Sequence, residues 1–210
     1  MKIAAPLPPD QIAAMLRSLT DVSVVVVGDF GFDAYLHLET LPGETSQETG
    51  RPIEAVRRFA YDPAGAANVA VNLVALGVRD VRAVGVVGDD LHGRELVRAL
   101  GMRGIDTSGF VTQTGGWQTV VYAKPHRDGI EGTRIDFGEF NELGAETNAE
   151  MLRRFREALR GEPAVIFNQQ VRRGVLEPSN IVDFVGAAAG AVTIADSRHH
   201  ARAFDGCRLS

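Results

Sequence analysis

The sequence contains a single cysteine, Cys207, among its 210 residues. One thiol cannot form an internal disulfide, and no cysteine or histidine spacing in the chain resembles that of a zinc site. A chain without disulfides is typical of a reducing compartment, so we expect a cytoplasmic protein.

Long apolar runs and an excess of positive charge are also missing. The apolar run from Val22 to Val27 is too short to span a bilayer. The segment 1–21 does not resemble a signal peptide, because Asp10, Gln11 and Arg17 interrupt its apolar residues. The formal net charge of −5 offers no general basic surface for a phosphate backbone. We therefore expect neither a membrane nor a nucleic acid as partner.

Several motifs that define common enzyme classes are absent. A nicotinamide-dependent oxidoreductase needs Gly-x-Gly-x-x-Gly after its first strand, whereas this chain has Gly28-Asp29-Phe30-Gly31, whose acid would repel a pyrophosphate. There is no Gly-x-x-x-x-Gly-Lys loop and no Gly-x-Ser-x-Gly elbow. The adjacent pair His199-His200 does not suit a metal site, since neighbouring side chains on a regular element point apart.

What is present is a regular alternation of buried strands and helices. Apolar, largely β-branched runs predict strands at 22–27, 82–87, 164–168 and 191–195. Helical spacing and start signals predict helices beginning near Pro9, at 66–76, at 90–100 with Asp89 as cap, after the capping box Thr147–Glu150, and from Pro178. This order predicts a three-layer α/β fold around a parallel sheet.

Two segments break the pattern and predict a small second sheet. Residues 34–41 and 51–59 alternate apolar and polar side chains around Pro42-Gly43, and residues 119–123 and 132–137 are also β-rich. We expect these stretches, about 34–62 and 117–138, to form a β lid that leaves the main sheet.

Polar residues that directly follow predicted strands are the first candidates for a site. In parallel sheets ligands bind beyond the carboxyl ends of the strands, which here carry Asp29, Asp33, Asn168 and Asp196. A carboxylate accepts several hydroxyl hydrogen bonds, which suits a polyol. For Asp29 an alternative stays open, namely that it accepts backbone N–H groups of a nearby turn.

A small-residue helix start supplies the next candidates. Ala64-Gly65-Ala66-Ala67-Asn68 would let backbone approach a ligand closely, and Asn68 adds an amide that donates and accepts. Close packing of a small-residue helix on the sheet explains the same pattern.

The order of these motifs resembles that of the ribokinase-like (PfkB) carbohydrate kinases. The motifs are Gly28-x-x-x-x-Asp33, Pro42-Gly43-Glu44-Thr45, the Ala64–Asn68 helix start, and Gly88-Asp89-Asp90 with Gly93. The segment Thr133–Phe137 is similar to one in the heptose-phosphate kinases of that family. The resemblance runs from Val22 to the end of the chain.

The resemblance implies ATP-dependent transfer of a phosphoryl group to a hydroxyl of a sugar or sugar phosphate, with Mg²⁺. It implies that Asp33, Gly65 and Asn68 line the sugar pocket, and that the lid closes over the sugar and pairs two subunits. Asp29, Arg134 and Asn168 join the candidate substrate contacts, with Lys124 or Arg172 as further phosphate partners. Asp196 and Arg198 are the candidates for the cofactor side.

Departures from the family pattern limit what the resemblance implies. Ala64-Gly65 stands where the family has Gly-Gly, and Asn168–Gly174 lacks the acid and lysine of an Asp-Tyr-x-Lys-Gly run. The family's Asp-Thr-x-Gly-Ala-Gly-Asp motif, which carries the catalytic base, does not occur in the 210 residues. We therefore expect residues 1–210 to be the substrate-binding N-terminal portion of a kinase domain, with the nucleotide-binding portion absent and no catalytic base or metal ligand in this chain. The alternative is a non-catalytic sugar-binding or scaffolding protein.

Overall fold

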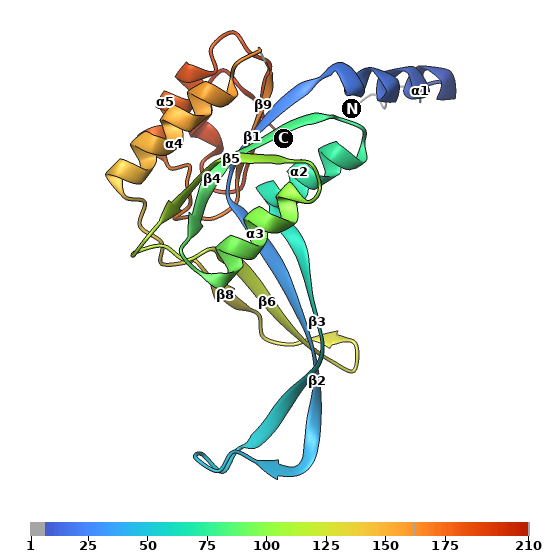
Figure 1. Cartoon of the computed structure of the whole chain (residues 1–210), viewed down its shortest axis with the longest axis vertical. Helices are drawn as coiled ribbons and strands as arrows, with labels where there is room; N and C mark the ends of the chain where they lie inside the picture. The colour runs from blue at the N-terminus through green and yellow to red at the C-terminus, as the bar shows by residue number, and fades with distance from the viewer. Residues whose placement is uncertain (1–6, 162, 210) are drawn as a thin grey trace.

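The computed structural model describes residues 7–161 and 163–209 of the chain. It contains two sheets, a parallel sheet within the body of the molecule and a second sheet that extends away from it (Figure 1). We call the second sheet the lid. It holds the strands β2, β3, β6, β7 and β8.

The body sheet has six parallel strands in the order β11-β10-β9-β1-β4-β5. The four expected strands are confirmed, while the strand at 106–113 was missed because its few apolar residues stand among polar ones. The strands are β1 (Ser23–Gly28), β4 (Asp80–Gly88), β5 (Asp106–Gln113), β9 (Ala164–Gln169), β10 (Thr193–Ser197) and β11 (Arg208–Leu209).

Helices cover both faces of the body sheet, as the valine run in β1 predicts. Val24 and Val26 pack in one core with residues of α2 (Ala66–Ala75) and α3 (Leu91–Gly101). Val25 and Val27 pack in a second core with residues of α4 (Ala145–Ala158) and α5 (Pro178–Ala187). The strand is therefore buried on both sides, and the predicted three layers are confirmed.

Two predicted helix caps were wrong. The cap of α3 is Asp90 instead of Asp89, and its Oδ1 accepts the N–H of Gly93 at 2.7 Å. Thr147 and Glu150 do not cap α4, which begins earlier with Gly144 as N-cap residue. The Gly144 N–H donates to Oε1 of the glutamine at position 113, so a tertiary contact sets the start of this helix.

The lid is a mixed sheet, with antiparallel and parallel strand pairs, that projects from the body. Its strands are β2 (Phe30–Thr45), β3 (Pro52–Gly65), β6 (Val120–Arg127), β7 (Ile130–Glu131) and β8 (Ile135–Phe137), with β2 paired to β3 and to β6. β2 begins directly after β1 ends at Gly28, and β3 ends at Gly65, where α2 begins. The lid is therefore joined to the body near Gly28 and Gly65.

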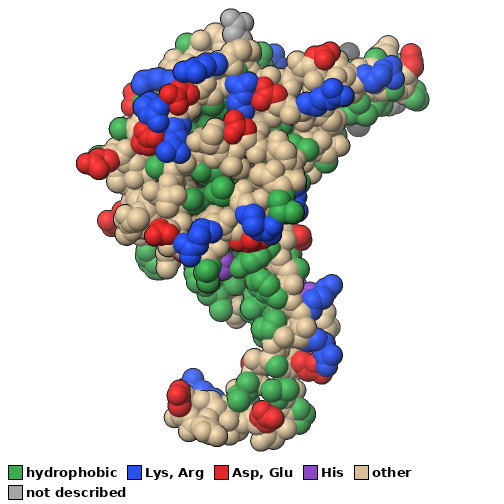
Figure 2. Space-filling view, viewed as in Figure 1, with side chains coloured by type: hydrophobic (Ala, Val, Ile, Leu, Met, Phe, Trp, Pro, Cys, Tyr) green, Lys and Arg blue, Asp and Glu red, His purple; other side chains and the backbone are tan. Residues whose placement is uncertain are grey.

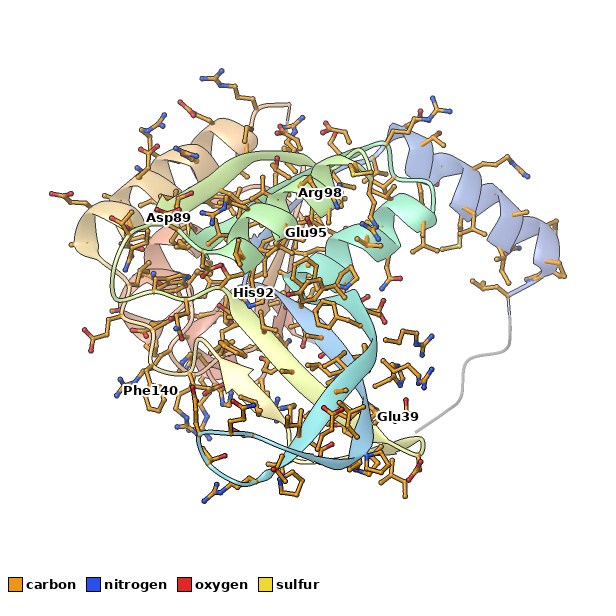
Figure 3. The ribbon with its side chains drawn as sticks, turned by 60° about the horizontal axis from the view of Figure 1, so that its bottom comes forward. Glu39, Asp89, His92, Glu95, Arg98 and Phe140 are labelled. Carbon is orange, nitrogen blue, oxygen red and sulfur yellow. The ribbon has the colours of Figure 1, made fainter. Side chains whose placement is uncertain are left out.

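The two faces of the lid differ in chemistry. One face carries apolar side chains, and where it meets the body Phe32 stacks on Tyr61 with ring centres 4.5 Å apart. Tyr61 in turn bonds His92 Nδ1 at 2.7 Å, and Figure 3 shows His92 where α3 meets the lid strands. The other face carries Asp33, Tyr35 and their cross-strand neighbours. We call these the apolar face and the polar face of the lid.

The first helix stands apart from the rest of the molecule. Helix α1 (Pro9–Ser18) and the short 3-10 helix η1 (Leu19–Asp21) bury no residue, and α1 projects from the body in Figure 1. A second 3-10 helix, η2 (Ala201–Ala203), follows β10. Within 7–161 and 163–209, no helix has the length and apolar character needed to cross a bilayer.

Candidate functional site

The carboxyl ends of three neighbouring strands bring the predicted site residues together. Gly28 at the end of β1 is in register with Asn168 of β9, and Asn168 is in register with Asp196 of β10. Gly65 joins them from the start of α2, where the N–H of Ala66 donates to the carbonyl of Asp29 at 2.9 Å. Four of the predicted residues thus lie at one edge of the sheet.

Asp29 faces a backbone loop. Its two carboxylate oxygens accept the N–H groups of Gln170 (2.7 Å), Val171 (2.9 Å) and Val175 (2.9 Å), and the side chain is buried. A Cβ on Gly174 would lie 2.1 Å from Oδ1 of Asp29, so the loop closes tightly on the carboxylate. Of the two roles that the sequence left open for Asp29, the geometry favours that of a loop anchor.

Burial and hydrogen bonding act in opposite directions on this carboxyl. Burial raises the pKa of Asp29, while the three N–H donors and the nearby His200 lower it. The group is fully engaged within the protein, and we do not include it among the proposed sugar contacts.

Gly65 adopts a backbone conformation that suits glycine alone. Its φ is +57°, and an added Cβ would lie 2.3 Å from the carbonyl oxygen of Asp29. This close approach places the first turn of α2 beside the end of β1. Asn68 in that turn is exposed, and its Oδ1 accepts from Nδ2 of Asn72 at 3.0 Å.

Asn168 holds an unpaired acceptor at the centre of the site. Its Nδ2 donates to Oδ2 of Asp196 at 2.8 Å, and Nε2 of Gln170 donates to the same oxygen at 3.0 Å. Oδ1 of Asn168 is buried, 3.7 Å from where a Cβ of Gly65 would stand, and has no hydrogen-bond partner among the residues that the structure describes. A buried acceptor gains most from a donor such as water or a ligand hydroxyl.

The polar face of the lid carries two ion pairs beside each other. Asp33 pairs with Lys124 across β2 and β6, with Oδ1 and Nζ 2.8 Å apart and both side chains mostly buried. Arg134 binds Asp136 through two hydrogen bonds of 2.6 Å and stacks 4.7 Å above the ring of Tyr122. Tyr122 is in register with both Asp33 and Asp136, so it connects the two pairs.

The polar face of the lid begins next to the end of the body sheet. β2 starts two residues after the end of β1, and Phe30 at its start is in register with Gly65. Asp33, three residues further along β2, is in register with Tyr122, so this part of the polar face borders the carboxyl end of β1. Burial and the charges of Asp29, Glu139 and Asp136 together raise the pKa of Tyr122 to about 12.

We expect the phenol of Tyr122 to titrate near pH 12 in the folded protein. Because this pKa is raised above the ordinary value of about 10, the contribution of Tyr122 to stability is complete below pH 10 and is lost as the pH rises towards 12. The measurement is tyrosinate absorbance after a rapid pH jump, for the wild type and Tyr122→Phe. If the titration that is lost in Tyr122→Phe has its midpoint near pH 10 in the wild type, this arrangement is contradicted.

A basic hollow lies beyond the end of β10. Arg198, His199 and Arg202 are exposed in it and His200 is half-buried, around a volume of about 580 Å³. The fully buried Gln169 holds the turn, because its Oε1 accepts from Ser197 Oγ and from the N–H groups of His199 and His200 at 2.8–3.2 Å. Burial and the neighbouring arginines lower the pKa of His199, which reflects the positive charge of this hollow.

The Gly-x-Asp-x-x-Gly element has a structural role. Besides capping α3, Asp90 accepts the N–H of Thr119 through Oδ2 at 2.9 Å, and Thr119 Oγ1 accepts the N–H of Gly88. A Cβ on Gly93 would lie 2.4 Å from the Gly88 carbonyl. The element thus fixes the point at which the chain enters β6 of the lid.

Sequence reasoning missed Tyr122 and Gln169 as parts of the site. For Tyr122 the signal was the period-two spacing with Lys124, which places both side chains on one face of a strand. Gln169 carries no such signal, because a glutamine at a strand end reads as a polar surface residue until its tertiary partners are known.

The arrangement of a parallel sheet, flanking helices and a β lid defines a ribokinase-like fold. Arabidopsis thaliana ribokinase, in a structure with ribose and ATP, matches with a TM-score of 0.57 at 23% identity, over 85% of this chain and 54% of that one. A possible 1-phosphofructokinase from Thermotoga maritima matches with a TM-score of 0.63 at 20% identity, over 87% and 55%.

Sequence comparison defines the family. Residues 22–148 match the model of the pfkB family carbohydrate kinases, and the chain belongs to that family. The "Bifunctional protein HldE" of Helicobacter pylori is 32% identical over 154 residues, which are 73% of this chain and 32% of that protein. The chain thus spans about a third of the length of this curated relative.

Proposed function

We propose that this chain is the sugar-binding part of an ATP-dependent sugar or sugar-phosphate kinase. The observation that carries the proposal is that the lid strand with Asp33, which Lys124 holds, starts beside Gly65, next to the sheet end that carries Asn168 and Asp196. Carboxylate and amide acceptors gathered at one edge of the sheet suit a ligand rich in hydroxyls.

Within this proposal the residues have distinct tasks. Asp33 accepts hydroxyl hydrogen bonds of the sugar, and Oδ1 of Asn168 accepts one more donor beside the backbone at Gly65. The helix start with Asn68 contributes a further amide at the rim. We assign no sugar contact to Arg134, because its guanidinium is already paired with Asp136.

The residues of the basic hollow fit the phosphates of ATP. Arg198 and Arg202 present positive charge in this hollow, which begins two residues after Asp196, and arginine binds phosphate oxygens through two N–H groups. When bound, ATP would supply the phosphoryl group. Within 7–161 and 163–209 no group of three or more histidine, cysteine or acidic side chains could hold a metal, so Mg²⁺ would be held mainly by the nucleotide, with Asp196 as the acid at hand.

We propose no residue of this chain as the catalytic base. The family motif that carries it does not occur in the 210 residues, so transfer of the phosphoryl group is proposed for the longer protein to which this chain would belong. A second candidate is a sugar-binding protein without catalysis, since the residues discussed above bind the ligand only. An in-frame continuation that encodes the motif would support the kinase, and a genuine stop codon after Ser210 would support the binding protein.

The kinase proposal is tested by ADP release from ATP–Mg²⁺ in a panel of sugars and sugar phosphates, with the longest product of the gene. Release that depends on one sugar or sugar phosphate is the expected result. No sugar-dependent release, by a product that contains the motif, would overturn the proposal.

The apolar face of the lid supports pairing with a second copy of the chain. Outside the contact with the body, Val56, Phe59 and Ile135 are about half exposed on this face, and Figure 2 shows the apolar side chains gathered on the lid. Leu36 is in register with Phe59, and Leu38 with Val56, so the exposed side chains form a continuous stripe. Such a stripe on a projecting sheet suits a self-complementary dimer interface.

Substitution Phe59→Glu is expected to convert the dimer into a monomer, because it places a charge in the centre of the apolar stripe. Phe140→Glu is the matched control, since Phe140 is 89% exposed and lies on the loop after β8 (Figure 3). Sedimentation velocity across a concentration series is the measurement. A wild type that stays monomeric throughout, or equal behaviour of both variants, would contradict a lid dimer.

A further inference from the structure

Three basic side chains form a row across the polar face of the lid. His37 of β2 is in register with Arg58 of β3 on one side and with His126 of β6 on the other. Arg58 Nη2 lies 2.7 Å from His37 Nε2, and the two imidazole rings are 5.6 Å apart. Three adjacent strands therefore present potential cations at one level of the sheet.

Two of the acids near this row pair with other cations, and the third, Glu131, lies within ion-pair distance of His126. Asp33 pairs with Lys124, and Glu39 pairs with Arg57. The carboxylate of Glu131 on β7 stands 3.8 Å from Nε2 of His126, which is longer than a hydrogen bond. The positive charge of the row is thus only partly balanced.

The side chains of the row also have N–H groups that are available to donate hydrogen bonds. His37 Nε2 accepts from Arg58, so in neutral His37 the proton is on Nδ1. His126 Nδ1 lies 2.9 Å from the carbonyl of Lys124, which can only accept, so this nitrogen carries the proton, while Nε2 lies 3.8 Å from the carboxylate of Glu131 and makes no direct hydrogen bond to it. Arg58 uses one Nη2 contact and keeps further N–H donors of its guanidinium.

We propose that His37, Arg58 and His126 form a binding subsite for a phosphate monoester on the polar face of the lid. Arg58 binds two of the phosphate oxygens and the imidazoles donate to the others. The subsite uses none of the residues that we assign to the sugar hydroxyls, and His37 lies four residues, about 13 Å, along β2 from Asp33. The phosphate belongs either to the sugar substrate or to a separate phosphorylated effector.

Phosphate binding at this row is coupled to protonation. Burial, Arg58 and His126 lower the pKa of His37 when no anion is present. A phosphate favours the imidazolium forms, so its affinity rises as the pH falls through the histidine range. The charged and titratable groups that face the row are Tyr35 and Glu39 on β2, Arg58 on β3, Lys124 on β6 and Glu131 on β7. Of these, Glu131 is the one that opposes phosphate binding to His126 directly.

The test is an NMR titration of the imidazole C–H signals with inorganic phosphate, in the wild type and in variants of the protein. The chain has five histidines, and single His→Gln variants assign their signals. Phosphate is expected to shift the signals of His37 and His126 and to raise the pKa of His37, which is lowered without an anion. Arg58→Gln is expected to weaken phosphate binding about tenfold or more, since a hydrogen bond to a charged group contributes about 1.5–3 kcal/mol.

Two controls keep the proposal falsifiable. Arg94→Gln removes an exposed arginine of α3 that pairs with Asp89, and it should bind phosphate as the wild type does. If Arg58→Gln fails to fold, His126→Asn replaces it and should weaken binding to a similar extent. Phosphate that leaves His37 and His126 unchanged, or that binds Arg58→Gln with wild-type affinity, would overturn the subsite.

A second pair of probes distinguishes the source of the phosphate. If it belongs to the sugar, glucose 6-phosphate should bind more tightly than inorganic phosphate, and this gain should disappear in Asp33→Ala. If it belongs to a separate effector, both probes should bind alike and independently of Asp33. Glucose 6-phosphate that binds without any change at His37 and His126 would contradict both. Because no ATP is used, the subsite and the proposed kinase activity fail independently.

Discussion

Substitution of Asp33 by alanine is expected to raise the KM for the sugar about a hundredfold or more. The carboxylate is held by Lys124 at 2.8 Å on the polar face of the lid. In the proposed complex it accepts two sugar hydroxyls, and two hydrogen bonds to a charged group contribute about 3 kcal/mol or more. Steady-state ADP release with the sugar as variable substrate measures the effect.

The variants that accompany Asp33→Ala separate binding from folding. Asp33→Asn keeps one acceptor oxygen and should show a smaller increase in KM. Asp183→Ala removes an exposed acid from α5, which packs on the sheet face opposite α2, and should leave KM unchanged. An unchanged KM for the sugar in Asp33→Ala would remove Asp33 from the site.

Substitution of Asp29 by alanine is expected to lower the free energy of unfolding by about 3–5 kcal/mol. The change removes the acceptor of three backbone N–H groups, of Gln170, Val171 and Val175, in a buried position. Each buried donor left without a partner costs about 1–3 kcal/mol, and the loop relaxes only in part. Urea denaturation followed by far-UV circular dichroism measures the loss.

Asp29→Asn provides the matched comparison. The amide keeps one acceptor oxygen and the side-chain volume but loses the charge and the second acceptor, so its effect should lie between those of the wild type and Asp29→Ala. A loss below about 1 kcal/mol in Asp29→Ala, the level of one ordinary hydrogen bond, would show that water or another group replaces the carboxylate.

The body of the fold follows directly from local sequence patterns. The valine run in β1 predicts a strand buried on both faces, and in the structure Val24 and Val26 lie in one core and Val25 and Val27 in the other. Helix caps were less predictable. The cap of α3 is Asp90, because its second oxygen is fixed by Thr119, which is 29 residues away in the sequence.

The sequence predicts that several of these residues lie together, but it did not indicate Tyr122 or Gln169 or the contacts that each residue makes. That Asn168 and Asp196 lie side by side follows from the parallel sheet, since both end neighbouring strands. Whether Asp29 or Asp33 faces a ligand depends on tertiary contacts that no spacing shows. The loop after β9 returns to Asp29 and uses both of its oxygens, whereas Asp33 moves out with the lid and meets Lys124.

The paired charges of the lid illustrate the same limit. Lys124 and Arg134 read in the sequence as basic residues with a possible phosphate partner, but in the structure each already pairs with a carboxylate. The row of His37, Arg58 and His126 could not be seen from spacing, because its members come from three strands separated by up to 89 positions.

The most direct test of the proposed sugar site is a thermal-shift screen of wild type and Asp33→Ala against sugars and sugar phosphates, with ATP–Mg²⁺ present. A ligand that binds the native state raises Tm according to its concentration and affinity. We predict that at least one sugar or sugar phosphate raises the Tm of the wild type and leaves that of Asp33→Ala unchanged. An equal rise in both proteins would contradict a sugar site built on Asp33.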